Sequence, residues 1–179
     1  MSKKEKSTIF SIRLKESIKS KLELESELHN VNTNTLINQI ITKYLEWDRY
    51  SKDVGSVYIT KRFLRGVFEE LPDNKISMLA SSISAEAFRD AIVFMHGEFN
   101  YVNTIITMKK WLENSDYQFR HTTDGVDKFV IHHGMGTNWS LYFTTMMTVL
   151  LKELEYGLKD IANNNESICF TITKFSSYG

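Results

Sequence analysis

Residues 7–15 read STIFSIRLK, and this stretch decides how the N-terminal part of the chain is organised. Its residues fall into two alternating sets, with Phe10, Ile12 and Leu14 on one side and Ile9, Ser11 and Arg13 on the other. An alternation of period two indicates a β-strand with one buried face. From about Glu16 to His29 the apolar spacing becomes helical, which predicts that a helix follows the strand directly.

A second helix is predicted after the break at residues 30–32. Asn32 is a good N-cap, and the residues that follow form an apolar stripe of Leu36, Ile37, Ile40, Ile41 and Tyr44. Residues 49–56 are polar and contain a glycine, so we interpret them as a linker. The sequence therefore predicts an N-terminal domain at residues 1–48 and a second domain at residues 57–179.

A lone strand with two short helices buries too little surface to fold by itself. The simplest solution is a homodimer in which two copies of residues 7–15 pair antiparallel, with Phe10, Ile12 and Leu14 facing the helices. The outer face of such a two-stranded ribbon fits the major groove of double-stranded DNA. There Arg13 can bond guanine, Ser11 can donate or accept, and Ile9 can contact a thymine methyl.

Charge supports a polyanionic partner at this end of the chain. The whole sequence has no net charge, yet residues 1–21 contain seven basic and two acidic residues, a net charge of +5. We expect Lys4, Lys6 and Lys15 to lie near phosphates. The start of the second helix, with Asn32, Thr33, Asn34 and Thr35, is a second phosphate-binding candidate, because helix N-termini present free N–H groups and partial positive charge.

These features resemble the ribbon-helix-helix family, which contains the Arc and MetJ repressors. The resemblance rests on the sequences IFSIRLK, ESIKSKLELESEL, HNVN and TNTLINQII, and it covers about 40 of the 179 residues. It implies that Ile9, Ser11 and Arg13 read bases and that the first turn after Asn32 clamps a phosphate. Asn30 stands where glycine is frequent in the family, and asparagine tolerates the same left-handed backbone. The resemblance also implies tetramers on DNA, since two dimers commonly occupy adjacent half-sites.

The second domain is predicted to be α+β. Three helices at about residues 60–71, 73–97 and 100–114 precede a β-β-α-β unit with a small antiparallel sheet. The strands of that unit are expected at 117–121, 128–133 and 168–175, with a helix at 139–158. Pro72 should end the first helix, and Asp124-Gly125 is a hairpin signal.

The histidines raise the question of a metal site. His132 and His133 are neighbours on a strand, so they point to opposite faces and cannot share one ion. A two-residue turn at Asp124-Gly125 would place His132 opposite Tyr117 and too far from His121 for shared ligation. We therefore expect hydrogen-bonded structural histidines and no metal.

No catalytic set or cofactor motif is present, so we expect neither an enzyme nor a cofactor. The glycine-punctuated stretch 134–139 (GMGTNW) could cradle an anion, but it lacks the lysine of a P-loop, and a tight strand-to-helix turn is the preferred interpretation. Cys169 is the single cysteine, and neither a signal peptide nor a membrane span is found, which favours a cytoplasmic protein.

The sequence thus predicts a transcriptional regulator, in the first instance a repressor, that binds DNA sequence-specifically as a homodimer. The second domain would serve assembly or the sensing of an effector of unidentified chemistry. The alternative is a protein-interaction or small-ligand-binding module in which the N-terminal segment only dimerises.

Overall fold

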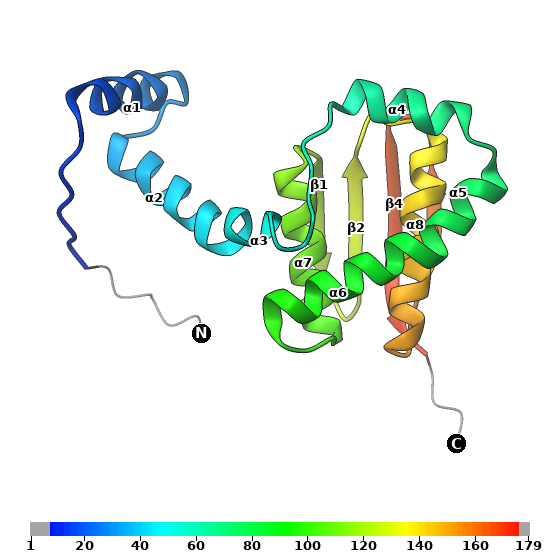
Figure 1. Ribbon diagram of the computed structural model, residues 1–179. Coiled ribbons are helices and arrows are strands. Elements are labelled where there is room, and N and C mark those ends of the chain that lie inside the picture. The colour runs from blue at the N-terminus through cyan, green and yellow to red at the C-terminus, as the bar shows by residue number, and fades with distance from the viewer. Residues whose placement is uncertain (1–7, 176–179) are drawn as a thin grey trace. The chain divides into compact units, whose positions relative to one another are not determined.

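The computed structural model describes residues 8–175 and divides the chain into two compact units, Met1–Arg49 and Tyr50–Gly179 (Figure 1). The model contains both helices and a four-stranded antiparallel sheet, so the chain is α+β. Lys4 and Lys6, two of the predicted phosphate contacts, lie outside the described residues.

The N-terminal unit is a helical hairpin. Helix α1 (Glu16–Leu28) and helix α2 (Thr33–Lys43) are joined by a tight turn, and α2 continues through the π-helical turn η1 (Tyr44–Asp48) into the short α3 (Arg49–Ser51). Asn30 in the turn has φ 53°, the left-handed conformation predicted for this position. Residues 8–15 form no strand in the single chain, and Lys15 is extended where α1 begins.

Three predicted helical regions of the C-terminal unit are confirmed. They are α4 (Lys61–Glu70), the continuous run of α5 (Asp73–Leu79), η2 (Ala80–Ser84) and α6 (Ala85–His96), and α7 (Tyr101–Asn114). Leu71 is extended with ψ 132°, as expected before Pro72. Gly97 ends α6 with φ 82°, a left-handed cap that glycine adopts without strain.

The sheet contains one strand more than the sequence predicted. After β1 (Gln118–Thr123), β2 (Asp127–His132) and α8 (Thr137–Glu153), the chain forms two further strands, β3 (Tyr156–Asn163) and β4 (Ser167–Lys174). The sheet order is β1-β2-β4-β3. The predicted helix at 139–158 was therefore wrong at its C-terminal end, and the unit is β-β-α-β-β. Leu151, Leu154 and Leu158 keep helical spacing, which hides the break, but Glu155 turns left-handed with φ 65°.

The β1–β2 hairpin also has a different register from the predicted one. Gln118 pairs with His132 and Thr123 pairs with Asp127, which leaves a three-residue loop at 124–126 with Gly125 at φ 73°. A shift of one residue changes which side chains are neighbours across the strands. His121 therefore lies opposite Phe129, and the predicted pairing of His132 with Tyr117 was wrong.

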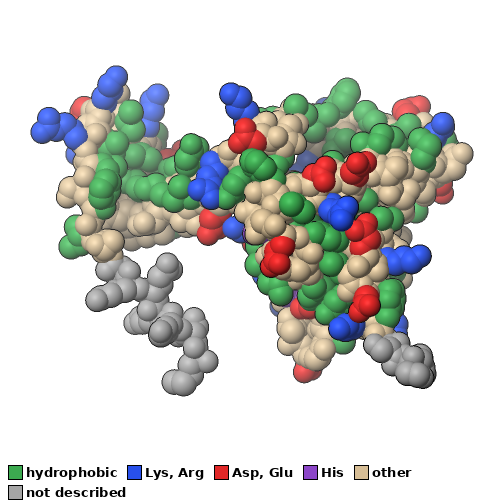
Figure 2. All heavy atoms as spheres, turned by 60° about the horizontal axis from the view of Figure 1, so that its bottom comes forward, with side chains coloured by type: hydrophobic (Ala, Val, Ile, Leu, Met, Phe, Trp, Pro, Cys, Tyr) green, Lys and Arg blue, Asp and Glu red, His purple; other side chains and the backbone are tan. Residues whose placement is uncertain are grey.

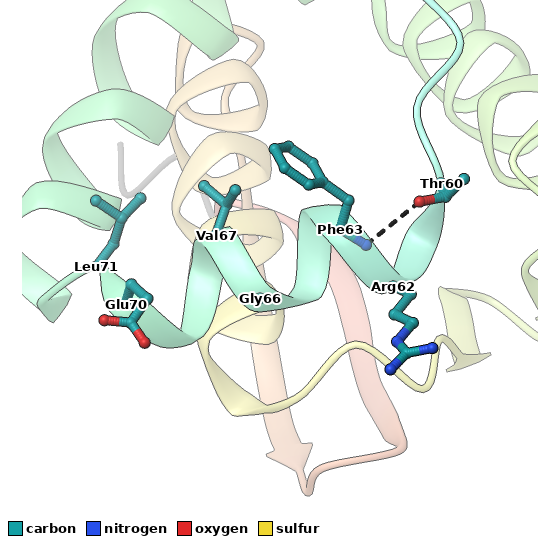
Figure 3. Close-up of a pocket in the computed structure, with 7 residues that line it drawn as sticks. All are labelled: Thr60, Arg62, Phe63, Gly66, Val67, Glu70 and Leu71. Atoms are coloured by element: carbon teal, nitrogen blue, oxygen red, sulfur yellow. Dashed lines mark hydrogen bonds between the residues drawn. The ribbon is translucent and has the colours of Figure 1, made fainter.

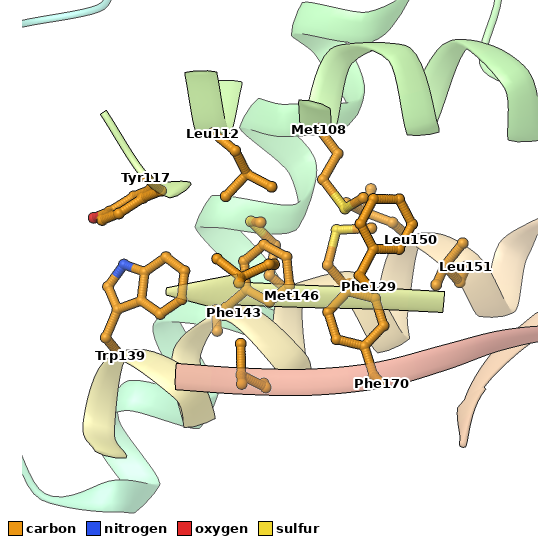
Figure 4. Close-up of a cluster of buried hydrophobic side chains, with 14 of the residues drawn as sticks. Met108, Leu112, Tyr117, Phe129, Trp139, Phe143, Met146, Leu150, Leu151 and Phe170 are labelled. Atoms are coloured by element: carbon orange, nitrogen blue, oxygen red, sulfur yellow. The ribbon is translucent and has the colours of Figure 1, made fainter. Parts of the chain in front are cut away.

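The core of the C-terminal unit lies between one face of the sheet and the helices, with α8 against the sheet (Figures 1 and 4). Phe129 stacks on Phe170 between neighbouring strands, and Phe170 contacts Phe143 from α8. Trp139 stacks on Phe143 with ring centroids 5.2 Å apart. The hydrophobic side chains that are fully buried here include Ile76, Met108, Leu112, Ile131, Met146 and Leu150. This unit therefore has a continuous apolar core of its own.

Candidate nucleic-acid interface

The helical hairpin of the N-terminal unit is held mainly by its turn and by one short polar contact. Ser26 is buried, and its Oγ lies 2.8 Å from the carbonyl oxygen of Glu23 and 3.2 Å from Thr33 Oγ1. Leu36 is the one buried hydrophobic residue among the described residues of this unit. The contacts fix the start of α2 against α1, but they supply very little apolar burial.

The predicted base-reading residues lie on an exposed, extended segment. The side chain of Ile9 is 97% exposed, and Ser11, Arg13 and Lys15 are exposed as well. Arg13 has no ion-pair partner among residues 8–175. Its guanidinium is therefore free to meet a phosphate or a base.

The opposite side of the same segment is exposed although it is apolar. Phe10 is 83% exposed and Ile12 is 50% exposed, where the sequence predicted burial beneath a ribbon. Figure 2 shows hydrophobic side chains on the visible face of this unit, beside several Lys and Arg side chains. Exposed large apolar residues of the unit also include Leu14, Ile18, Leu24, Leu28, Ile40, Ile41, Tyr44 and Leu45. An apolar surface of this extent on a small unit is typical of a protein interface.

The first turn of α2 has the features of a phosphate-binding helix start. Asn32 Oδ1 accepts a hydrogen bond from the backbone N–H of Thr35 at 2.9 Å, which confirms the predicted N-cap. Asn34 is exposed, and the first turn contains no acidic residue. The Thr33 hydroxyl is engaged by Ser26, so at this residue the backbone N–H is the group that can bind an anion.

Each of the five histidines has a hydrogen-bond partner. The backbone N–H of Met135 donates to His133 Nδ1 at 3.0 Å, which leaves Nε2 to donate to Ser140 Oγ at 3.0 Å. Burial, with a smaller effect of His132, lowers the pKa of His133 to about 4, so the ring is neutral. The partners of the other four are Glu25 for His29, Thr107 for His96, Asp127 for His121 and Ser167 for His132. Within residues 8–175, no three metal-ligating side chains come together.

A polar cluster that sequence reasoning missed joins α7 to the β1–β2 hairpin. The carboxylate of Asp127 accepts hydrogen bonds from the Tyr101 hydroxyl and from Thr123 Oγ1, the latter at 2.9 Å, and it pairs with His121 Nε2 at 2.6 Å. Burial alone would raise the pKa of Asp127, but these three contacts together hold it below its ordinary value. Tyr101 and Asp127 are 26 positions apart, and no local spacing signals their meeting. Both carboxylate oxygens have a partner, and the cluster links α7 to the hairpin.

The glycine-rich turn before α8 is a strand-to-helix connection, which confirms the preferred interpretation. The N–H groups of Gly134 and Gly136 donate to the carbonyl oxygens of Glu166 and Asn165, at 3.1 and 2.9 Å. Met135 N–H is taken by His133. No N–H group of these three residues is left to bind an anion.

Comparison with known proteins adds no family to these observations. No protein-family model, curated protein or solved structure shows a significant match to the chain. In the part of the chain that the structure describes, no helix is long and apolar enough to cross a membrane.

Proposed function

We propose that the chain is a sequence-specific DNA-binding regulator of transcription that acts as a homodimer. In this proposal, residues 8–15 of two copies pair into an antiparallel ribbon whose outer face enters the major groove. The observation that carries it is the two-sided exposure of this segment: Phe10 and Ile12 form an uncovered apolar side, and Ser11 and Arg13 form an uncovered polar side.

The apolar side needs a cover that the described residues of the N-terminal unit do not supply. Burying a phenylalanine, isoleucine or leucine side chain contributes roughly 1.5–3 kcal/mol. A two-fold ribbon covers Phe10, Ile12 and Leu14 of both copies at once, which contributes on the order of 10 kcal/mol before the cost of ordering the segment. The same pairing gives each strand the hydrogen-bonding neighbour that residues 8–15 lack in one chain.

The polar side fits a nucleic acid better than a protein partner. Arg13 and Lys15 are both exposed, and the residues before them add a net positive charge. The uncharged first turn of α2 supplies a second group of donors without a repelling carboxylate. An arginine on a ribbon can bond guanine O6 and N7 with two N–H groups, which gives discrimination of about 1–3 kcal/mol per contact.

Fluorescence anisotropy with DNA from upstream of the protein's own gene tests the proposal. The wild type should prefer this duplex over a scrambled one, and its affinity should decrease steeply with salt. Arg13→Ala should abolish the preference, whereas Arg120→Ala, an exposed arginine on β1, should retain it. A selection from random duplexes follows if neither duplex is preferred. Failure to select any sequence would overturn DNA reading and leave residues 8–15 as a dimerisation segment.

A further inference from the structure

Helix α4 (Lys61–Glu70) presents an outer face that the described residues of the C-terminal unit leave uncovered. Its inner face is fixed to the C-terminal unit: Phe68 is buried, Arg65 Nη1 donates to the Gly134 carbonyl oxygen at 3.2 Å, and Asn138 Nδ2 donates to the Phe68 carbonyl oxygen at 2.8 Å. On the outside, Phe63 is 61% exposed and Val67 is 39% exposed. These side chains border a groove of about 730 Å³ along the helix (Figure 3).

Two oppositely charged residues of this groove lie at equal distances from Gly66 in the sequence. Arg62 lies four positions before Gly66 and Glu70 lies four positions after it, at the two ends of the face drawn in Figure 3. Gly66 has no atom within 4 Å of where a Cβ would be, so a neighbouring backbone can approach closely. Glycine weakens the interior of a helix relative to alanine, so its place here suits close packing better than helix stability.

The charges of α4 oppose the dipole of the helix that carries them. Its first turn contains Lys61 and Arg62, and its last turn contains Glu69 and Glu70. Basic residues at a helix N-terminus and acidic residues at its C-terminus are unfavourable in an isolated helix. Glu69 is paired with Arg65 at 2.8 Å, whereas Arg62 and Glu70 have no ion-pair partner among residues 8–175.

We propose that α4 packs antiparallel against α4 of a second copy of this chain, across a two-fold axis at Gly66. In that arrangement Arg62 of each copy faces Glu70 of the other, and each acidic C-terminal turn lies beside the partner's helix N-terminus, where the dipole favours negative charge. Phe63 and Val67 of both copies are buried between the helices. The charges on this face are therefore paired when two copies of α4 pack antiparallel. This contact is separate from the pairing of residues 8–15.

Disulfide trapping in the full chain tests the orientation directly. In a Cys169→Ser background, the double variant Arg62→Cys/Glu70→Cys should form a covalent dimer on mild oxidation, seen on a non-reducing gel. Residues 62 and 70 of one helix are about 12 Å apart along its axis, and so are two copies of either residue in the antiparallel pair. A disulfide needs Cα atoms within about 7 Å, so neither single-cysteine variant should cross-link. Cross-linking of the single variants, or none in the double variant, would overturn the antiparallel pair.

Adding Gly66→Leu to the double-cysteine variant tests the close approach. A Cβ at residue 66 has no atom within 4 Å, and leucine is a better helix former than glycine, so the thermal unfolding midpoint should be retained or raised while cross-linking decreases at least about tenfold. Unchanged cross-linking would show that the helices do not meet at Gly66. Neither readout involves DNA, so this contact and the proposed DNA binding can each fail without the other.

Charge exchange provides an independent check by sedimentation of the full chain carrying Ile12→Asp, which removes the N-terminal pairing. Arg62→Glu or Glu70→Arg should each weaken the dimer that forms through α4 by about tenfold. Each single change brings like charges together at both of the symmetry-related contacts between residue 62 of one copy and residue 70 of the other. The exchange variant Arg62→Glu/Glu70→Arg should recover the original dissociation constant. Three variants with equal dissociation constants would contradict the Arg62–Glu70 contact.

Discussion

Asn32 Oδ1 accepts a hydrogen bond from the backbone N–H of Thr35 at 2.9 Å, and this bond places the cap of α2 at the proposed phosphate contact. Replacing Asn32 with alanine should lower the free energy of unfolding of the N-terminal unit by about 1 kcal/mol. Urea unfolding followed by circular dichroism measures the change.

Asn32→Asp distinguishes the helix-capping role of residue 32 from its proposed contact with a phosphate. Aspartate caps a helix as well as asparagine does, so stability should be retained. Its carboxylate would repel a phosphate, and affinity for DNA should decrease about tenfold or more, with Asn32→Ser as the neutral capping control. Equal affinities of the aspartate and serine variants would exclude a phosphate at this turn.

The two sides of residues 8–15 should respond differently to the same charge. Ile12→Asp places a carboxylate on the apolar side and should convert the N-terminal dimer to monomers, because burying an unpaired charge is very costly. Ser11→Asp, one residue earlier, should leave the dimer intact and weaken DNA binding. Sedimentation equilibrium of the isolated N-terminal segment, which lacks α4, measures the first effect, and anisotropy with the full chain measures the second. Dissociation by both variants would contradict the ribbon.

His133 should make the C-terminal unit less stable in mild acid. In the folded chain, burial lowers its pKa to about 4, whereas the ordinary value is 6.5. Between these values the unfolded chain binds more protons, so the free energy of unfolding is highest above about pH 6.5 and decreases as the pH falls towards 4. His133→Gln should show a smaller decrease over this interval in urea unfolding. Parallel pH profiles of the two proteins would refute the assignment.

Tyr101 should control the ionisation of Asp127. Its hydroxyl is one of the donors that keep the pKa of the Asp127 carboxyl low, so Tyr101→Phe should raise that pKa. A carboxyl titration by NMR measures it. Tyr156→Phe is the matched control, because the Tyr156 ring stacks on Tyr101 at 4.0 Å while its hydroxyl is not among the donors to Asp127. The same shift in both variants would point to ring stacking instead.

Local signals predicted the features that depend on neighbouring residues. The cap at Asn32, the left-handed Asn30 and the stop before Pro72 each follow from the chemistry of one residue and its neighbours. The prediction failed where two patterns competed. Leu158 continues a leucine spacing that begins in α8, so β3 was hidden, and the three-residue loop at 124–126 shifted the hairpin register by one.

Features that depend on the folded chain could not be predicted in this way. The Tyr101–Asp127 contact joins a helix to a strand, and its formation depends on how α7 packs against the sheet. The groove on α4 is visible in the sequence only as an amphipathic helix with reversed charges. Its inner face packs on the core through Phe68 and is joined to it by Arg65 and Asn138, whose bonds to carbonyl groups distant in the sequence leave no local signal.

Leu36 is the one buried hydrophobic side chain among the described residues of the N-terminal unit. The folding of this unit should therefore depend on the concentration of the protein. Under the proposed pairing this unit folds by mass action, so the concentration of folded dimer rises with the square of the chain concentration, and the folded fraction in proportion to it, when dimers are scarce. The C-terminal unit, with its own core, stays folded at any dilution. We therefore expect limited proteolysis of a dilute sample to remove residues 8–48 first and leave the C-terminal unit intact.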